Sequence, residues 1–182
     1  MATGVGAGFI IGGRPYVGAS GTAREIGHTV VDPGGPICRC GNRGCLETLA
    51  GAPAILAALR DAYGDNLTLA EVVTRAHNGD VGCRRIIADA GRITGTAVAT
   101  LCNLFNPRRI IVGGDLGSAG ELLLDPLRES LKLSTIRSAS EDVEVVESSL
   151  GERAEVLGAV ALVLRHSTNL LEGSVLNSAA GD

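Results

Sequence analysis

Three of the five cysteines fall within eight residues, and this cluster constrains the chain more than any other feature. The cluster consists of Cys38, Cys40 and Cys45, and His28 shortly precedes it. Zinc prefers four soft or borderline ligands in a tetrahedron, which three thiolates and one imidazole supply. Four protein ligands leave no open position. We therefore expect a structural zinc site that supplies much of the local folding energy, rather than a Lewis-acid site.

The spacing within the cluster agrees with a shared ion. A single residue separates Cys38 from Cys40, so the chain between them must be extended. Gly41 and Gly44 then permit the tight turn that brings Cys45 back. The alternative is three free thiols in a loop, although buried cysteines seldom cluster so tightly.

Length and composition indicate one full-sized domain. Of the 182 residues, 45% are hydrophobic and only 2% aromatic, so Ala, Val, Leu and Ile must build the core. A net charge of -4 and the absence of a basic stripe argue against direct nucleic-acid binding by this segment. No apolar run approaches the ~20 residues of a membrane span, and no signal peptide is visible. We expect a cytoplasmic location, where thiols stay reduced unless a metal holds them.

Two apolar runs flank a glycine pair near the start of the chain. The runs from Phe9 to Ile11 and at Tyr16-Val17 surround Gly12-Gly13, a pattern that predicts a β-hairpin. A natural domain seldom begins so abruptly on a strand, so we expect upstream sequence to be missing.

Residues 52 to 105 carry helix signals. Thr68 and Glu71 form a capping-box pattern, and Asp80 can cap the longest helix. The helices are expected over Ala54 to Tyr63, over Leu69 to His77, and from just after Asp80 to about Phe105.

The longest of these helices carries small residues on one face. Gly91, Gly95 and Ala99 recur every four positions, which lays a smooth stripe where another backbone can pack closely. The partner could be a second copy of the chain, the domain's own sheet, or a lobe outside this chain. Cys83 and Cys102 on the same helix are interpreted as small core residues.

Strands and helices alternate after the long helix. A strand is expected at Arg109 to Val112, a helix after Gly113-Gly114 at Gly120 to Leu133, a strand at Val143 to Val146 and a helix at Glu152 to Leu164. This alternation predicts an α/β fold with parallel pairing, and helices packed on a mixed sheet. The small and polar residues 167–182 are expected to form a flexible tail.

The cysteine cluster lies within a longer pattern. The run Glu25-Ile26-Gly27-His28 and the pattern Cys38-x-Cys-Gly-x-x-Gly-Cys-x-Glu47 resemble the signature of the ROK family (repressors, open reading frames, kinases). The match continues at Thr3-Gly-Val-Gly-Ala-Gly8 and at Asn106-Pro-Arg-Arg-Ile-Ile-Val-Gly-Gly-Asp-Leu-Gly117. The cysteine signature is highly specific, whereas glycine loops alone are weak signals.

The resemblance implies the C-terminal lobe of a two-lobed, actin-like ATPase (ribonuclease H-like) fold, with sugar bound between the lobes. Glu25 and Glu47 would accept hydrogen bonds from sugar hydroxyls. His28 would direct one ring nitrogen to zinc and the other, with its tautomer fixed by the metal, to the sugar. On the residues alone, Arg24 could instead clamp Glu25, and Glu47 could instead favour the positive end of a helix dipole.

The glycine loops resemble the family's nucleotide loops. Thr3, Gly4 and Gly6 match the second phosphate loop, and Gly113 and Gly114 match the turn after the adenosine-motif strand. Their backbone N–H groups would face phosphates. For the first loop, a hairpin that needs glycine for its twist is the alternative. ATP and Mg²⁺ are expected only if the parent protein is a kinase.

The resemblance also bears on function. Kinases of the family need an N-terminal lobe with a first phosphate loop and a catalytic aspartate, and neither is found in this sequence, so we expect this chain alone to be inactive. Asp115 stands where the kinases usually carry a third glycine, and its carboxylate would repel phosphate.

We therefore expect residues 1–166, with a zinc loop at 25–47, to form the sugar-sensing and oligomerisation domain of a transcriptional regulator. Its DNA-binding domain would lie outside this chain, and a homo-oligomer is expected. The alternatives are the C-terminal lobe of a zinc-containing, glucokinase-like, ATP-dependent sugar kinase, and a pure oligomerisation module.

Overall fold

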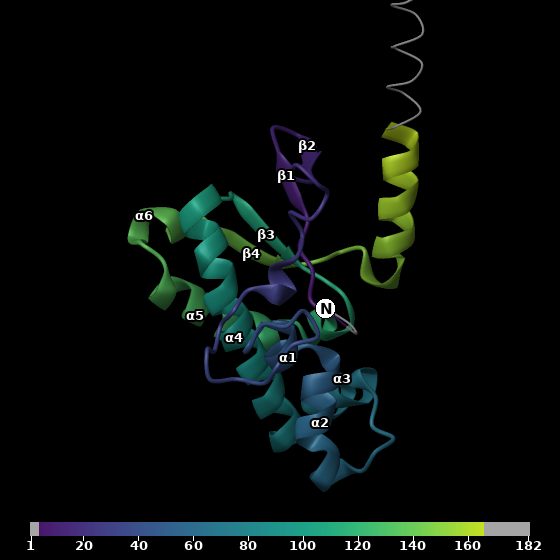
Figure 1. The fold of residues 1–182 in the computed structure, drawn as a ribbon. Coiled ribbons are helices and arrows are strands. Elements are labelled where there is room, and N and C mark those ends of the chain that lie inside the picture. Colours follow the sequence, from purple (N-terminus) through teal and green to yellow (C-terminus); the bar gives the residue numbers. More distant parts are fainter. Residues whose placement is uncertain (1–3, 166–182) are drawn as a thin grey trace, which may run out of the picture. The chain divides into compact units, whose positions relative to one another are not determined.

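The computed structural model of the chain describes residues 4–165 and is drawn in Figure 1. Thr3 and the tail expected over 167–182 lie outside the described residues. The chain divides into one compact unit that ends at Ser148 and a second that begins at Ser149. The second unit contains a short 3-10 turn, η3 (Gly151–Arg153), and a helix over 154–165, close to where the sequence predicts one.

The first unit opens with the expected hairpin. Its strands are β1 (Phe9–Ile11) and β2 (Arg14–Tyr16), which pair antiparallel. Gly12 and Gly13 have φ angles of 56° and 74°, a region that glycine enters without steric cost and that a two-residue hairpin turn requires. The Phe9 ring packs on the Phe105 ring with centroids 5.3 Å apart, which attaches the hairpin to the end of the long helix.

A 3-10 helix, η1 (Ile26–His28), and the short α1 (Glu47–Ala50) follow the hairpin, and after them come three longer helices close to the predicted bounds. They are α2 (Ala52–Tyr63), α3 (Leu69–His77) and α4 (Val81–Phe105). The capping box of Thr68 and Glu71 begins α3, and the Asp80 side chain accepts the backbone N–H of Cys83 to begin α4. Asn106 ends α4 in the left-handed region at φ 43°. The capping predictions are confirmed.

The small-residue stripe of α4 packs against α5 (Glu121–Ser134). A Cβ added to Gly91 would lie 2.5 Å from the Leu123 carbonyl oxygen, and one added to Gly95 would meet the Leu127 carbonyl oxygen. Such close approach is possible only without a side chain. The stripe therefore contacts a helix of the same unit, which corrects the prediction that a sheet, a second copy or a missing lobe covers it.

The later part of the unit contains a parallel strand pair. It is formed by β3 (Arg109–Val112) and β4 (Glu144–Glu147), with Arg109 paired to Glu144. The 3-10 helix η2 (Asp115–Ala119), α5 and the short α6 (Arg137–Ser140) connect the two strands. The expected α/β class is confirmed. Among the described residues, however, the strands form two separate two-stranded sheets rather than one mixed sheet.

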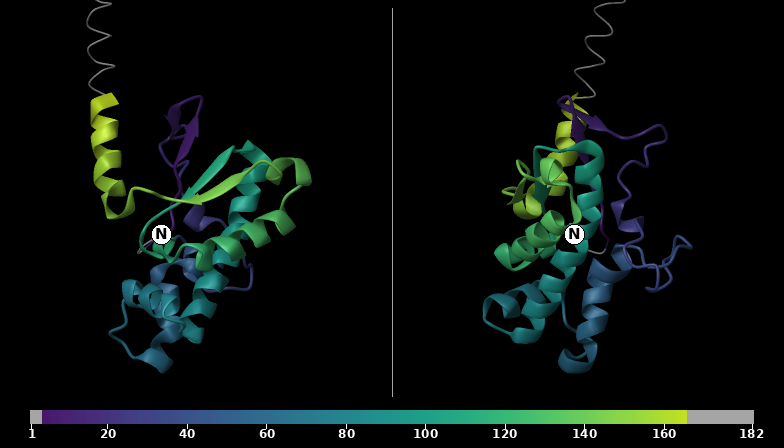
Figure 2. Two further views of the ribbon diagram at one scale, coloured as in Figure 1. Left: turned by 180° about the vertical axis from the view of Figure 1, so that it is seen from behind. Right: turned by 90° about the vertical axis from the view of Figure 1, so that its left-hand side faces the viewer.

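The core of the first unit lies around α4. Its fully buried side chains include Ile87 from α4 and Leu123, Leu124 and Leu127 from α5. Cys83 and Cys102 are buried and unpaired, as expected for core residues. In the side view of Figure 2, residues 25–47 and α5 lie on opposite sides of α4. The long helix therefore lies between the cysteine-containing segment and α5.

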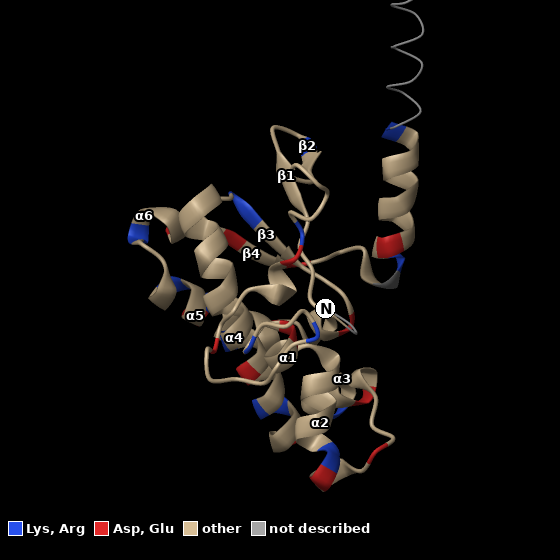
Figure 3. Cartoon of the chain, in the orientation of Figure 1, with Lys and Arg blue, Asp and Glu red and all other residues tan. Residues whose placement is uncertain are grey.

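Surface charge is mixed rather than segregated. Figure 3 shows Lys and Arg spread over several elements and interspersed with Asp and Glu. Within residues 4–165, no helix combines the length and the apolar character that crossing a membrane demands.

Candidate metal and sugar site

The cysteine loop, residues 25–47, folds back on itself through backbone hydrogen bonds. The Gly44 carbonyl accepts the N–H of Val31 at 2.9 Å, and the Gly44 N–H donates to Pro36 O at 2.7 Å. Gly44 has φ +67°, and an added Cβ would overlap the Asp32 carbonyl, so only glycine fits there. This close approach of two backbone segments brings Cys45 back to the start of the loop.

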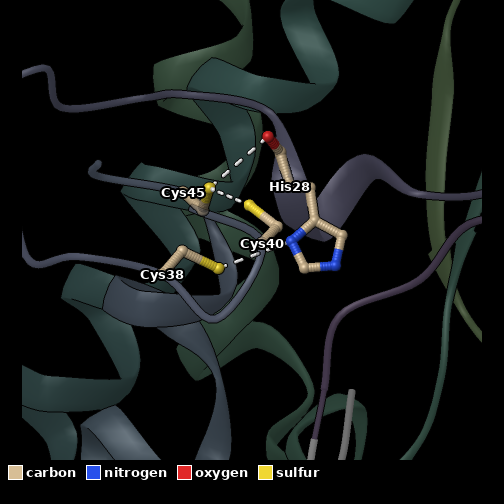
Figure 4. Close-up of side chains that lie close together, drawn as sticks. All are labelled: His28, Cys38, Cys40 and Cys45. Carbon is tan, nitrogen blue, oxygen red and sulfur yellow. Dashed lines mark hydrogen bonds between the residues drawn. The ribbon is translucent and has the colours of Figure 1, made fainter. Parts of the chain in front are cut away.

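The loop gathers the four predicted ligands at one point, as Figure 4 shows. One donor atom each of His28, Cys38, Cys40 and Cys45 lies within 4.8 Å of all the others. The Cys40 and Cys45 sulfurs are 3.6 Å apart, and the Cys38 sulfur lies 3.5 Å from His28 Nδ1. Nothing else within residues 4–165 forms a comparable group of metal-binding side chains.

The geometry fits a tetrahedral zinc ion. Zinc binds sulfur at about 2.3 Å and nitrogen at about 2.0 Å, which in a tetrahedron separates two sulfurs by about 3.8 Å and a sulfur from a nitrogen by about 3.5 Å. The Cys40–Cys45 distance of 3.6 Å and the Cys38–His28 distance of 3.5 Å are close to these values. The four side chains could hold such an ion with little rearrangement.

The environment of the thiols also suits a cation. Burial raises the pKa of the Cys45 thiol to about 12, because desolvation disfavours the thiolate. At the exposed Cys40, the backbone N–H of Asn42 lowers the pKa to about 7. A divalent ion bound at the cluster would favour the thiolate over the neutral thiol at Cys45 and would so offset the cost of burying the charge.

The imidazole of His28 lies between the cysteines and Glu25. Its Nδ1 faces the cysteine cluster, and its Nε2 lies 3.8 Å from Glu25 Oε2. The Glu25 side chain is 62% exposed. With a metal on Nδ1, the Nε2 hydrogen would become a donor of fixed direction beside an open carboxylate.

Glu47 is the first residue of α1 (Glu47–Ala50), where a carboxylate also suits the helix dipole. Its Oε1 lies 3.6 Å from His28 Nδ1 and 3.3 Å from the Cys38 sulfur. Arg39 donates to both carboxylate oxygens, at 3.2 Å and 3.3 Å. The three groups expected at a sugar, Glu25, His28 and Glu47, are therefore adjacent.

The arginine that clamps a carboxylate is not the one we expected. Among the described residues, Arg24 forms no ion pair with Glu25, whereas Arg39 forms a two-point pair with Glu47. Sequence reasoning missed Arg39 because it lies between two cysteines and has no pattern of its own. The only local signal that could have identified Arg39 is its position between those two cysteines.

The glycine loops occupy different surroundings. A Cβ on Gly4 would lie 3.7 Å from Glu47 Oε2, so the first glycine loop passes beside the Glu47 carboxylate. Gly114 has φ +81° and begins η2, while Gly113 lies against Ser148, 3.1 Å from an added Cβ. Sequence analysis predicted a turn at this pair but not η2. The predicted residue Thr3 lies outside the described residues.

The expected sugar contacts lie away from the hollow beside α2. A hollow of about 350 Å³ beside α2 is lined by residues that include Leu56, Arg60 and Leu67, and none of the three expected sugar contacts lines it. Beside the cysteine cluster, Glu25 is exposed, whereas the His28 and Glu47 side chains are 24% and 13% exposed.

Comparisons with known proteins agree with this picture. A model of the ROK family matches residues 1–166. The DNA-binding transcriptional dual regulator NagC of Escherichia coli (strain K12) is 36% identical over 175 residues, which cover 91% of this chain and 43% of NagC. A glucokinase of Thermotoga maritima is 36% identical over 180 residues, which cover 90% of this chain and 56% of that enzyme.

A solved structure shows the same fold. The crystal structure of a ROK family glucokinase from Streptomyces griseus, in complex with glucose and AMPPNP, matches with a TM-score of 0.78 at 32% identity. The match covers 89% of this chain and 58% of that chain. The expected actin-like ATPase fold is thereby confirmed. The chain spans about half the length of the curated relatives it matches. Since the family model covers most of its length, the chain belongs to the ROK family.

Proposed function

We propose that the chain is the sugar-sensing domain of a ROK-family transcriptional regulator, stabilised by a zinc ion. The observation that carries the proposal is the arrangement of His28, which directs Nδ1 to the cysteine cluster and Nε2 toward Glu25. Glu47 lies beside the same ring. Two carboxylates and one fixed N–H donor suit a molecule rich in hydroxyl groups.

Zinc is the proposed ion, and its role is structural. His28, Cys38, Cys40 and Cys45 would fill its coordination shell, so no position remains for substrate. The ion would hold the loop in the shape that orients Glu25, His28 and Glu47. Purified protein should therefore contain close to one equivalent of zinc, and a preparation without it would count against this role.

A direct binding experiment tests the sugar site. We expect glucose, N-acetylglucosamine or xylose to bind the zinc-loaded chain in a titration followed by NMR or calorimetry. Glu25→Gln should weaken binding at least about 10-fold, because a neutral amide accepts hydroxyl bonds less well than a carboxylate. Glu129→Gln, an exposed position on α5, serves as the matched control. Failure of every sugar to bind the wild-type chain would refute the proposal.

The regulatory role rests on similarity to NagC, which its name describes as a DNA-binding transcriptional regulator. A bound sugar can regulate only if it binds one conformational state more tightly than another. In the complete regulator, we propose that sugar binding closes the two lobes and changes the spacing of DNA-binding domains in a dimer. Operator affinity that stays the same with every sugar would contradict this mechanism.

A kinase is the second candidate, because the T. maritima glucokinase is as similar as NagC. ATP and Mg²⁺ would then bind near the glycine loops at Gly4, Gly6, Gly113 and Gly114. Asp115 favours the regulator, since a carboxylate next to Gly114 would repel phosphate groups. Sugar-dependent phosphoryl transfer by the complete protein, without operator binding, would favour the kinase.

A further inference from the structure

Arg39 has a place in the site that the proposed function does not explain. Its guanidinium donates to both oxygens of Glu47, at 3.2 Å and 3.3 Å. The Arg39 side chain is 77% exposed, while that of Glu47 is only 13% exposed. Solvent screens the exposed arginine end of the pair, so folding stability alone is not a sufficient reason for it.

The surroundings of Glu47 supply that reason. Its Oε1 lies 3.3 Å from the Cys38 sulfur, one of the four atoms of the cysteine cluster. A divalent ion bound by three thiolates and a neutral imidazole leaves one net negative charge on the cluster. The Glu47 carboxylate would then face a negatively charged group and would be pushed away from it. Arg39 is the cation that contacts this carboxylate.

The backbone of Arg39 is flanked on both sides by candidate metal ligands. Cys38 and Cys40 flank it, and both belong to the cysteine cluster. A metal that fixes both neighbours also fixes the start of the Arg39 side chain, so less freedom is lost when the guanidinium engages Glu47. Two parallel hydrogen bonds then set the plane of the carboxylate.

We propose that Arg39 is a positioning residue for sugar binding, which holds the Glu47 carboxylate in place against the negative charge of the loaded cluster. Glu25, in contrast, is exposed and contacts only His28 among the ion pairs of the described residues. The two carboxylates therefore differ: Glu47 is held in one geometry, and Glu25 is free to adapt to the sugar. This inference rests on the proposed sugar site.

The test compares variants for sugar affinity and zinc content together. Arg39→Ala should weaken sugar binding about 10-fold or more, because the carboxylate loses its orientation. Arg39→Lys should restore part of the affinity, since it keeps the charge but not the two-point geometry. Arg43→Ala is the matched control: this arginine belongs to the same loop but donates to Gly35 O rather than to Glu47. Zinc content should stay at the wild-type level in all three.

A double-mutant cycle separates positioning from other effects. In a Glu47→Gln background, which removes the charge that Arg39 holds, Arg39→Ala should change sugar affinity less than about 2-fold. Wild-type affinity in Arg39→Ala, or equal losses in both backgrounds, would overturn the inference. Loss of zinc from Arg39→Ala and Arg39→Lys alike would also overturn it, because Arg39 would then serve the metal loop. If the wild-type chain binds no sugar, the proposed function itself fails.

Discussion

Cys45 is the most buried of the four candidate metal ligands. Its side chain is completely buried, and its sulfur lies 3.6 Å from the Cys40 sulfur and 3.5 Å from the His28 carbonyl oxygen. The buried thiol therefore lies where the end of the cysteine loop returns to its start. Cys102, equally buried in α4, has no such neighbours and fills space in the core.

We therefore expect Cys45→Ala and Cys102→Ala to separate the two roles. Cys45→Ala should weaken zinc binding by more than about 100-fold, since loss of a hydrogen-bond partner behind a metal ligand alone costs roughly 10- to 100-fold. Cys102→Ala should leave the zinc content unchanged. Competition with a chromogenic chelator measures both. Equal zinc affinity in the two variants would remove Cys45 from the metal site.

Tyr63 and Asp80 form a hydrogen bond that shifts the pKa of both side chains. The tyrosine hydroxyl donates to Asp80 Oδ1 at 2.6 Å, and the Cys83 backbone N–H donates to the same oxygen at 2.9 Å. These two bonds, the backbone one first, hold the pKa of Asp80 below its ordinary value of 3.8. The bond to Asp80, followed by burial, raises the pKa of Tyr63 from 10.0 to about 12.

The signs of these shifts define a pH window. The lowered pKa of Asp80 stabilises the fold above pH 3.8, and this contribution is lost as the pH falls through the lower folded value. The raised pKa of Tyr63 stabilises the fold below pH 10.0, and this contribution is lost as the pH rises towards about 12. Tyr63→Phe should therefore reduce the free energy of unfolding most between these limits.

Urea denaturation across this pH range measures the difference between Tyr63→Phe and the wild type. Both proteins carry the same cysteine cluster, so its titration cancels in the difference. Tyr16→Phe, at an exposed tyrosine of the hairpin, is the control for loss of a tyrosine hydroxyl and should give a small difference in stability at neutral pH. A Tyr63→Phe difference that stays constant at both extremes would contradict the shifts.

At the scale of elements, α4 and α5 pack backbone against backbone. Gly91 and Gly95 let the α5 backbone approach α4, so that an added Cβ on Gly91 would lie 2.5 Å from the Leu123 carbonyl oxygen. Since the atoms on the other side are backbone, they cannot rotate away as a flexible side chain could.

Gly91→Ala should accordingly destabilise the first unit by about 1–3 kcal/mol, although alanine is the better helix former. Thr100→Ala, at an exposed position of the same helix, should have an effect within about 0.5 kcal/mol. Chemical denaturation followed by circular dichroism measures both variants. A Gly91→Ala protein more stable than the wild type would contradict the close packing of the two helices.

At the scale of the whole molecule, the chain spans 43% of NagC and 56% of the T. maritima glucokinase. Phosphoryl transfer depends on groups placed on both sides of the sugar and the nucleotide. We expect the 182-residue chain by itself to release no ADP from ATP in the presence of glucose and Mg²⁺. A coupled assay, with a ROK glucokinase as positive control, measures this, and sugar-dependent ADP release above the blank would contradict it.

Local signals predicted much of this molecule correctly. The starts of two helices follow from nearby side chains: Thr68 with Glu71 for α3, and Asp80 for α4. The hairpin follows from Gly12-Gly13. In contrast, η2 and α6 were not predicted, because short helical turns lack the periodicity that identifies longer helices.

The four candidate metal ligands can be identified without a structure, because residue type and short spacing decide which atoms can share an ion, and the signature that contains them identifies the family. Three other features became known from the folded chain: which nitrogen of His28 faces the cluster, that Arg39 rather than Arg24 holds a carboxylate, and that α5 covers the stripe of α4. Those contacts depend on how the chain closes on itself over long separations, and no local pattern records that closure.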